Sequence, residues 1–160
     1  MSTGTAAGPD GRAGIDAGLV RRLLAAQHPQ WADLPITPVE NDGWDNRTYR
    51  LGDELTVRLP TAAGYVPAVA KEDTWLPSLA PELPLPVPEP VATGEPGEGY
   101  PFPWSVRRWL PGSPARAHLV DDLGRFAADL AGFLRALWAV DVTGGPQAGG
   151  HSFHRRVSPS

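Results

Sequence analysis

The amino-acid sequence predicts an α+β fold: a five-stranded antiparallel sheet with a packing helix, flanked by an N-terminal helix and a long C-terminal helix. Three observations lead to this expectation. Short runs of residues alternate in polarity, as half-buried strands do. Longer stretches repeat apolar residues three and four positions apart, as amphipathic helices do. The 160 residues include 19 Pro and 18 Gly, which favours short elements joined by fixed turns.

The N-terminal helix is expected to run from Asp16 to about Gln27. The side chain of Asp16 can cap the first turn, and Pro29 follows where a helix should stop. The apolar residues form one stripe, which consists of Leu19, Val20, Leu23 and Leu24. Residues 1–14 are small, polar and rich in Gly, so we expect a disordered tail there.

Three strands are expected next, as an antiparallel meander over residues 36–40, 47–51 and 55–59. Residues 52–54 (Gly-Asp-Glu) have the length of a hairpin turn, and residues 41–46 (NDGWDN) form the other turn. Because side chains alternate along a strand, Thr56 and Arg58 should share one face of the third strand. Its apolar residues should share the opposite face.

The packing helix is expected within residues 66–80. Pro67 suits its first turn, and Pro77 should limit or bend its last turn. Residues 81–90 (PELPLPVPEP) are expected to form an extended connector, since each Pro lacks a backbone donor. Two further strands are expected near residues 87–93 and over residues 103–110.

The long C-terminal helix is expected over residues 117–140, with Asp121 and Asp122 in its first turns. Its apolar stripe is Leu119, Leu123, Phe126, Leu130, Phe133, Leu134, Leu137 and Trp138. Such a stripe packs on a core or a second lobe, or binds a partner helix. Residues 143–160 are Gly-rich and then basic, and we expect a second disordered tail.

Composition excludes several classes of protein. The absence of Cys removes disulfide scaffolds, zinc-thiolate sites and thiol nucleophiles. A net charge of −4 disfavours nucleic-acid binding. No apolar run approaches the ~20 residues of a membrane span, and residues 1–14 lack the apolar core of a signal peptide. His151 and His154 supply too few ligands for a metal site. We therefore expect a cytoplasmic protein that uses no membrane.

A lone cation, Arg58, lies among apolar residues of the third strand, and a lone carboxylate, Glu72, follows in the packing helix. The runs NDGWDNRTYRLGDELTVRLP, KEDTWLPSLAPELPLPVPEPVATG and PFPWSVRRWLPG surround them in this order. Together they resemble the N-terminal lobe of the aminoglycoside phosphotransferase family, which has a protein-kinase-like fold. The resemblance implies a kinase-like nucleotide-binding lobe over residues 15–114 and a linker helix over residues 115–142.

The resemblance also implies which residues bind ATP. Arg58 would contact the α- and β-phosphates in place of a residue that is often Lys, and Glu72 would pair with it. A loop would cover the phosphates, and the backbone of a hinge would hold the adenine. The loop residues are Asp42, Gly43, Trp44, Asp45 and Asn46, and the hinge residues are Trp109 and Leu110.

The chain departs from the family in its catalytic sequence. Phosphotransferases of this kind need a loop like H-G-D-x-x-x-x-N and a later metal-binding Asp. Asn occurs here only at positions 41 and 46, and His118 to Asp121 are followed by no Asn. We therefore assign no catalytic residue and no ligand for the Mg²⁺ that the family uses. We expect a truncated chain that is inactive alone, with a small-molecule acceptor only in a full-length parent.

The residues by themselves leave other interpretations open. Arg58 and Glu72 can be an ordinary ion pair, residues 41–46 a turn without a ligand, and Trp109 and Leu110 plain core residues. The alternative function is a non-catalytic module that binds a nucleotide or a protein, with self-association through the exposed face of the 119–138 helix. A structural α+β domain without a ligand is the third hypothesis.

Overall fold

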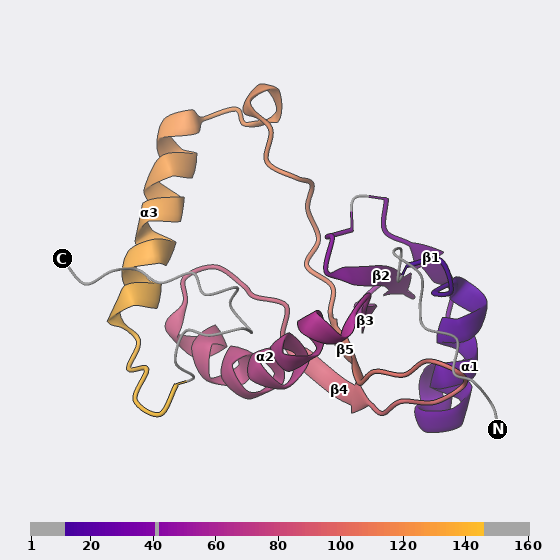
Figure 1. Cartoon of the computed structure of the whole chain (residues 1–160). Coiled ribbons are helices and arrows are strands. Elements are labelled where there is room, and N and C mark those ends of the chain that lie inside the picture. Colours follow the sequence, from indigo (N-terminus) through magenta and orange to yellow (C-terminus); the bar gives the residue numbers. More distant parts are fainter. Residues whose placement is uncertain (1–11, 41, 146–160) are drawn as a thin grey trace.

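The computed structural model describes residues 12–40 and 42–145. In chain order its main elements are α1 (Ala17–Gln27), β1 (Ile36–Pro38), β2 (Asn46–Leu51), β3 (Leu55–Pro60), α2 (Val66–Leu79), β4 (Pro90–Gly94), β5 (Trp104–Arg108) and α3 (Leu123–Ala139). Figure 1 shows α1 beside the sheet at one end of the molecule and α3 at the other end, away from the sheet. The arrangement confirms the predicted α+β fold class. Apart from residues 12–14 and 143–145, the two expected tails lie outside the described residues, as does Asn41.

The five strands form one sheet in the order β1-β2-β3-β5-β4, and every neighbouring pair is antiparallel. The first three strands form the predicted meander. The fourth strand begins at Pro90 rather than near residue 87, because the alternating prolines before it cannot donate to a ladder. The fifth strand ends at Arg108, so Trp109 and Leu110 lie just beyond the sheet.

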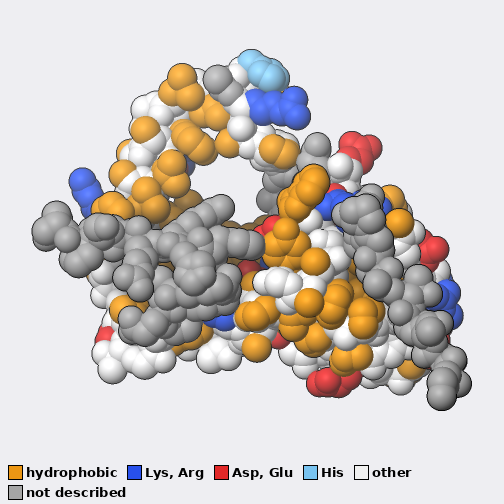
Figure 2. Space-filling model, viewed as in Figure 1, with side chains coloured by type: hydrophobic (Ala, Val, Ile, Leu, Met, Phe, Trp, Pro, Cys, Tyr) orange, Lys and Arg blue, Asp and Glu red, His pale blue; other side chains and the backbone are white. Residues whose placement is uncertain are grey.

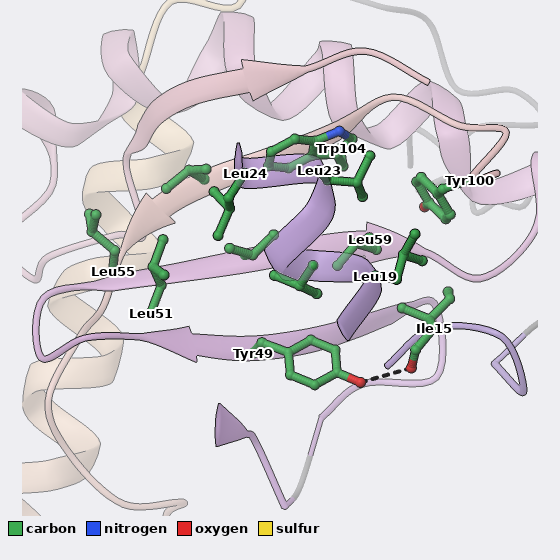
Figure 3. Packing of buried hydrophobic residues seen from close by; sticks show 13 residues of the cluster. Ile15, Leu19, Leu23, Leu24, Tyr49, Leu51, Leu55, Leu59, Tyr100 and Trp104 are labelled. Carbon is green, nitrogen blue, oxygen red and sulfur yellow. Dashed lines mark hydrogen bonds between the residues drawn. The ribbon is translucent and has the colours of Figure 1, made fainter. Parts of the chain in front are cut away.

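The core lies between α1 and one face of the sheet. Asp16 caps α1 as predicted, with its side chain accepting the Leu19 N–H at 2.7 Å. Figure 3 shows the apolar side chains of α1 meeting those of β2, β3 and β5. The phenolic hydroxyl of Tyr49 donates to the Ile15 carbonyl at 2.7 Å, which ties the start of α1 to the sheet. The residues of α1 buried in this core are Leu19, Val20, Leu23 and Leu24.

The opposite face of the sheet carries polar and charged side chains and meets α2. Strand register pairs Arg58 with Ser105 and Thr56 with Arg107. Since side chains alternate along each strand, these residues share the face opposite to the core. Pro67 lies in the first turn of α2, and the helix continues through Pro77 to Leu79. Val69 is the one residue of α2 that is buried.

The long C-terminal helix begins later than predicted. A short 3₁₀ helix covers Ala117–Leu119, and α3 begins at Leu123. The expected start at residue 117 is wrong because Asp122 caps the helix, its side chain accepting the Arg125 N–H at 2.9 Å. None of the residues of α3 is buried. Figure 2 shows hydrophobic side chains gathered along α3 and the segment that leads into it. Those most exposed are Leu119, Leu123, Phe126, Leu130, Leu134, Trp138 and Val142.

Candidate functional site

Arg58 and Glu72 lie in contact between the sheet and α2. The Arg58 Nη1 atom donates to Glu72 Oε2 at 3.1 Å. β3 is a central strand, so the Arg58 backbone is held by pairing with both β2 and β5. Both side chains are partly exposed, at 28% for Arg58 and 33% for Glu72. Among the described residues Glu72 is the only hydrogen-bond acceptor of Arg58, which leaves the other guanidinium N–H groups available to a ligand.

A second cation, Arg107, joins this pair, and sequence reasoning did not find it. Its side chain is 1% exposed, and its Nη1 atom lies 2.7 Å from the same Glu72 oxygen. Its Nη2 atom donates to Asp73 Oδ1 at 3.1 Å, and its Nε atom donates to Ser105 Oγ at 3.0 Å. The signal was present in the alternation of β5: with Trp104 and Val106 in the core, Arg107 must share a face with Arg58.

Burial and neighbouring charges shift the pKa values of two groups in this cluster, Asp73 and Arg107. Burial raises the pKa of Asp73 above its usual value, whereas the charge of Arg107 works in the opposite direction. Burial and then the charge of Arg58 lower the pKa of Arg107, and Glu72 and Asp73 oppose this shift. The result is a cluster of two guanidinium groups and two carboxylates, in which Glu72 contacts both arginines.

The predicted loop over the phosphates is held by contacts within the protein. The side chain of Asp42 is 7% exposed and accepts from Arg12 Nη2 at 2.6 Å and from Arg47 Nη1 at 3.4 Å. The Thr61 hydroxyl reaches the carbonyl oxygens of Trp44 and Asp45, both at 3.2 Å. Asp42 therefore shapes the loop, and its carboxylate is not directed to a ligand.

The other residues of this loop are less constrained by side-chain contacts than Asp42 is. The Trp44 side chain is 79% exposed, and a Cβ added at Gly43 would meet no atom within 4 Å. Asn46 begins β2 and faces Pro60 across the ladder, so it belongs to the sheet as well as to the loop. No side-chain hydrogen bond or ion pair in the described part of the chain links this loop to Arg58 or Glu72.

The two residues of the predicted hinge differ: Trp109 is used in contacts within the protein, whereas the Leu110 N–H has no acceptor among the described residues. The guanidinium of Arg50 stacks 4.3 Å from the centre of the Trp109 ring, and the Trp109 N–H donates to the Glu54 carbonyl at 2.8 Å. Neither group of Trp109 is therefore available to an adenine edge. Within residues 12–40 and 42–145, no acceptor takes the Leu110 N–H, which leaves a backbone donor directly after the sheet.

Metal binding and membrane crossing find no support in the described residues. Over residues 12–40 and 42–145, no three His, Asp or Glu side chains form a group that could hold a metal ion. In the same part of the chain, no helix is both long and apolar enough to cross a bilayer. The arrangement of Arg58, Glu72 and Arg107 instead has the chemistry of an anion site, since its uncommitted donors are cationic.

Comparisons with known proteins establish the family and the fold of this chain. Residues 35–159 match the model of the phosphotransferase enzyme family. The GDP complex of wild-type aminoglycoside 2'-phosphotransferase-IIIa superposes with a TM-score of 0.72 and 22% identity, over 81% of this chain and 44% of that one. Macrolide 2'-phosphotransferase MphH from Brachybacterium faecium superposes with a TM-score of 0.56 and 26% identity, over 81% and 46%. The comparison with curated proteins gave no match.

The match has a clear extent. The chain spans less than half the length of these solved structures. The superpositions show a shared kinase-like fold, and the family match covers all of the candidate site from Asp42 to Leu110. On this match the chain belongs to the phosphotransferase enzyme family.

Proposed function

We propose that the described part of this chain is the nucleotide-binding lobe of an ATP-dependent phosphotransferase that acts on hydroxyl groups of small molecules. One observation carries the proposal: Arg58 is held by Glu72 through one nitrogen, and its remaining donors have no acceptor among the described residues. Arginine binds phosphate through two N–H groups at once, and phosphoryl transfer depends on neutralising phosphate charge. The GDP and ATP complexes of structural neighbours support a nucleotide as the ligand.

The remaining residues have distinct roles in this proposal. The Leu110 N–H would donate to the adenine edge, and the loop from Asp42 to Asn46 would lie above the phosphates, with Trp44 at its surface. Asp42 would keep that loop in shape through Arg12 and Arg47. The 15–114 segment would be the nucleotide-binding lobe and 115–142 the linker. Use of ATP would place the protein in the cytoplasm.

A binding titration tests the nucleotide role. We expect the 160-residue chain to bind ATP, and we expect Arg58→Ala to weaken binding by roughly 10- to 100-fold, the loss of one or two charge-assisted hydrogen bonds. Adenosine should bind both proteins equally, since it has no phosphate. Arg125→Ala is the matched control, because this arginine lies on α3 with an 81% exposed side chain. Equal ATP affinity for the wild type and Arg58→Ala would overturn the proposal, as would no binding to the wild type.

We also propose that these 160 residues do not transfer phosphate on their own. The support is the sequence after Asn46, which contains no Asn to complete a catalytic loop. A structural neighbour is described as a complex with GDP and kanamycin, so kanamycin is the acceptor to try first. Incubation of the chain with Mg²⁺, ATP and kanamycin should give no phosphorylated product. ATP-dependent phosphorylation of the aminoglycoside by the purified chain would contradict this part of the proposal.

The apolar stripe of α3 supports a second candidate function, which is association through that face. The match covers 44% of the first structural neighbour. We propose that in such longer proteins this stripe packs on the part of the protein that lies outside the match. In the isolated chain a second copy would take that place. Sedimentation equilibrium should then show a dimer that Leu130→Glu converts to a monomer. A wild-type chain that stays monomeric over the whole concentration range would exclude this candidate.

A further inference from the structure

We propose that Arg107 is a positioning residue for the Arg58–Glu72 pair: it holds the Glu72 carboxylate so that the free donors of Arg58 stay directed to an anion. The inference deepens the proposed nucleotide site and rests on it for the identity of the anion. Arg107 lies on the face of the sheet opposite to the apolar core. Its effect would pass through Glu72.

The burial of Arg107 is the first argument. An arginine that is 1% exposed is rare unless acceptors surround it, because removing a guanidinium from water is costly. Three side chains meet it, from two different elements: Ser105 on β5, and Glu72 and Asp73 on α2. Arg107 therefore connects β5 to the middle of α2, where Glu72 and Asp73 lie.

The shared oxygen is the second argument. Arg107 Nη1 and Arg58 Nη1 lie 2.7 Å and 3.1 Å from the same atom, Glu72 Oε2. The nearer nitrogen belongs to the buried arginine, so Arg107 makes the shorter of the two ion pairs with Glu72. Attraction between the two charges therefore holds Glu72 on the Arg107 side, and a single directed hydrogen bond links it to Arg58.

Charge is the third argument. A lone Arg–Glu pair tends to close into a bidentate contact, in which the guanidinium commits two donors and its charge is neutralised. Here Glu72 divides its charge between two arginines. Burial raises the pKa of Asp73, whose Oδ1 atom accepts from Arg107 Nη2 at 3.1 Å. Arg58 shares its one carboxylate with Arg107, and it is the more exposed of the two arginines, with 28% of its side chain accessible.

The first test needs no ligand. In the wild type the Nε–H group of Arg58 should show restricted motion by ¹⁵N relaxation, with the exposed Arg125 as a mobile reference. Arg107→Met should raise the mobility of Arg58 toward that of Arg125, because Glu72 is no longer held. Arg108→Met is the matched control: Arg108 is the next residue, its side chain is 59% exposed, and its nearest carboxylate lies 3.9 Å away. Unchanged Arg58 relaxation in a folded Arg107→Met protein would overturn the inference.

A conservative variant covers the case in which Arg107→Met does not fold. Arg107→Lys keeps the positive charge in the buried site, but one ammonium group cannot hold Ser105, Glu72 and Asp73 together. We expect the Arg58 Nε–H to gain mobility in this variant as well. Arg58 relaxation identical to the wild type in folded Arg107→Lys would be evidence that the buried charge alone suffices, which is contrary to the positioning role.

The second test separates this inference from the proposed function. We expect Arg107→Met to weaken ATP binding about tenfold and to leave adenosine binding unchanged, an effect of the size that neighbouring groups in one network produce. In a Glu72→Gln background the same substitution should have little further effect, since Arg107 acts through the Glu72 carboxylate. Full ATP loss from Arg107→Met in both backgrounds would show a merely structural role. If the wild type binds no ATP, the nucleotide proposal fails, and the relaxation measurement still decides the positioning role.

Discussion

Two amphipathic helices of similar pattern, α1 and α3, have opposite surroundings in this molecule. The four apolar residues of α1 are buried against the sheet, whereas no residue of the longer α3 is buried. Both helices begin at an Asp that accepts a backbone N–H three residues later. The difference shows that periodicity predicts a helix and its apolar face, but not whether another element covers that face.

The largest expected difference between the two helices concerns truncation of their leucines. Leu23 is fully buried, so Leu23→Ala should lower the free energy of unfolding by about 2–5 kcal/mol, from lost transfer energy and the cavity left behind. At a concentration too low for association through α3, Leu130→Ala should change it by less than about 0.5 kcal/mol, since that side chain is 45% exposed in the monomer. Urea denaturation followed by Trp fluorescence measures both. Equal losses would mean that α3 is packed in solution.

The N-caps provide a second comparison at matched chemistry. Asp16→Ala should destabilise the whole domain by about 1 kcal/mol, because α1 is part of the core. Asp122→Ala should reduce the helical circular dichroism signal and leave the midpoint of domain unfolding unchanged, because α3 contributes no buried residue. If Asp122→Ala shifted the midpoint of domain unfolding, α3 would have to unfold cooperatively with the rest of the domain.

The hydrogen bond through which Tyr49 connects α1 to the sheet should contribute less to the free energy of unfolding. Tyr49→Phe removes the hydroxyl that donates to the Ile15 carbonyl and leaves the ring in the core. The expected loss is about 0.5–1.5 kcal/mol, measured by denaturation, for one buried hydrogen bond. No loss for Tyr49→Phe would mean that the core alone positions α1.

The smallest expected effect is a pH dependence on the opposite, charged face of the sheet. Burial raises the pKa of Asp73 in the folded chain above the usual 3.8, so the native state binds this proton more tightly than the unfolded chain does. Between 3.8 and the raised value, stability should therefore fall as pH rises. Asp73→Asn should flatten that part of the profile, and Asp53→Asn, in the exposed turn between β2 and β3, should not. An unchanged slope in Asp73→Asn would contradict the assignment.

Much of the local structure was predictable from particular residues. Asp16 and Pro29 bracket α1, the residues between β2 and β3 have the length of a turn, and the prolines of residues 81–90 delay β4 until Pro90. Arg58 stood out as a single charge among apolar residues, and Glu72 was singled out by the resemblance to the phosphotransferase family. The start of α3 was misplaced because Asp121 and Asp122 both suit a first turn, and only the backbone shows that Asp122 is the cap.

The sequence by itself determined which segments become strands and helices, because alternation, capping and proline chemistry act over a few neighbouring residues. Only the tertiary structure decided what those segments meet. It buried Arg107 beside Glu72, used the Trp109 N–H and Asp42 carboxylate within the protein, and left the face of α3 exposed. The physical reason is that burial and charge pairing depend on strand order and helix placement, which bring together residues far apart in the chain.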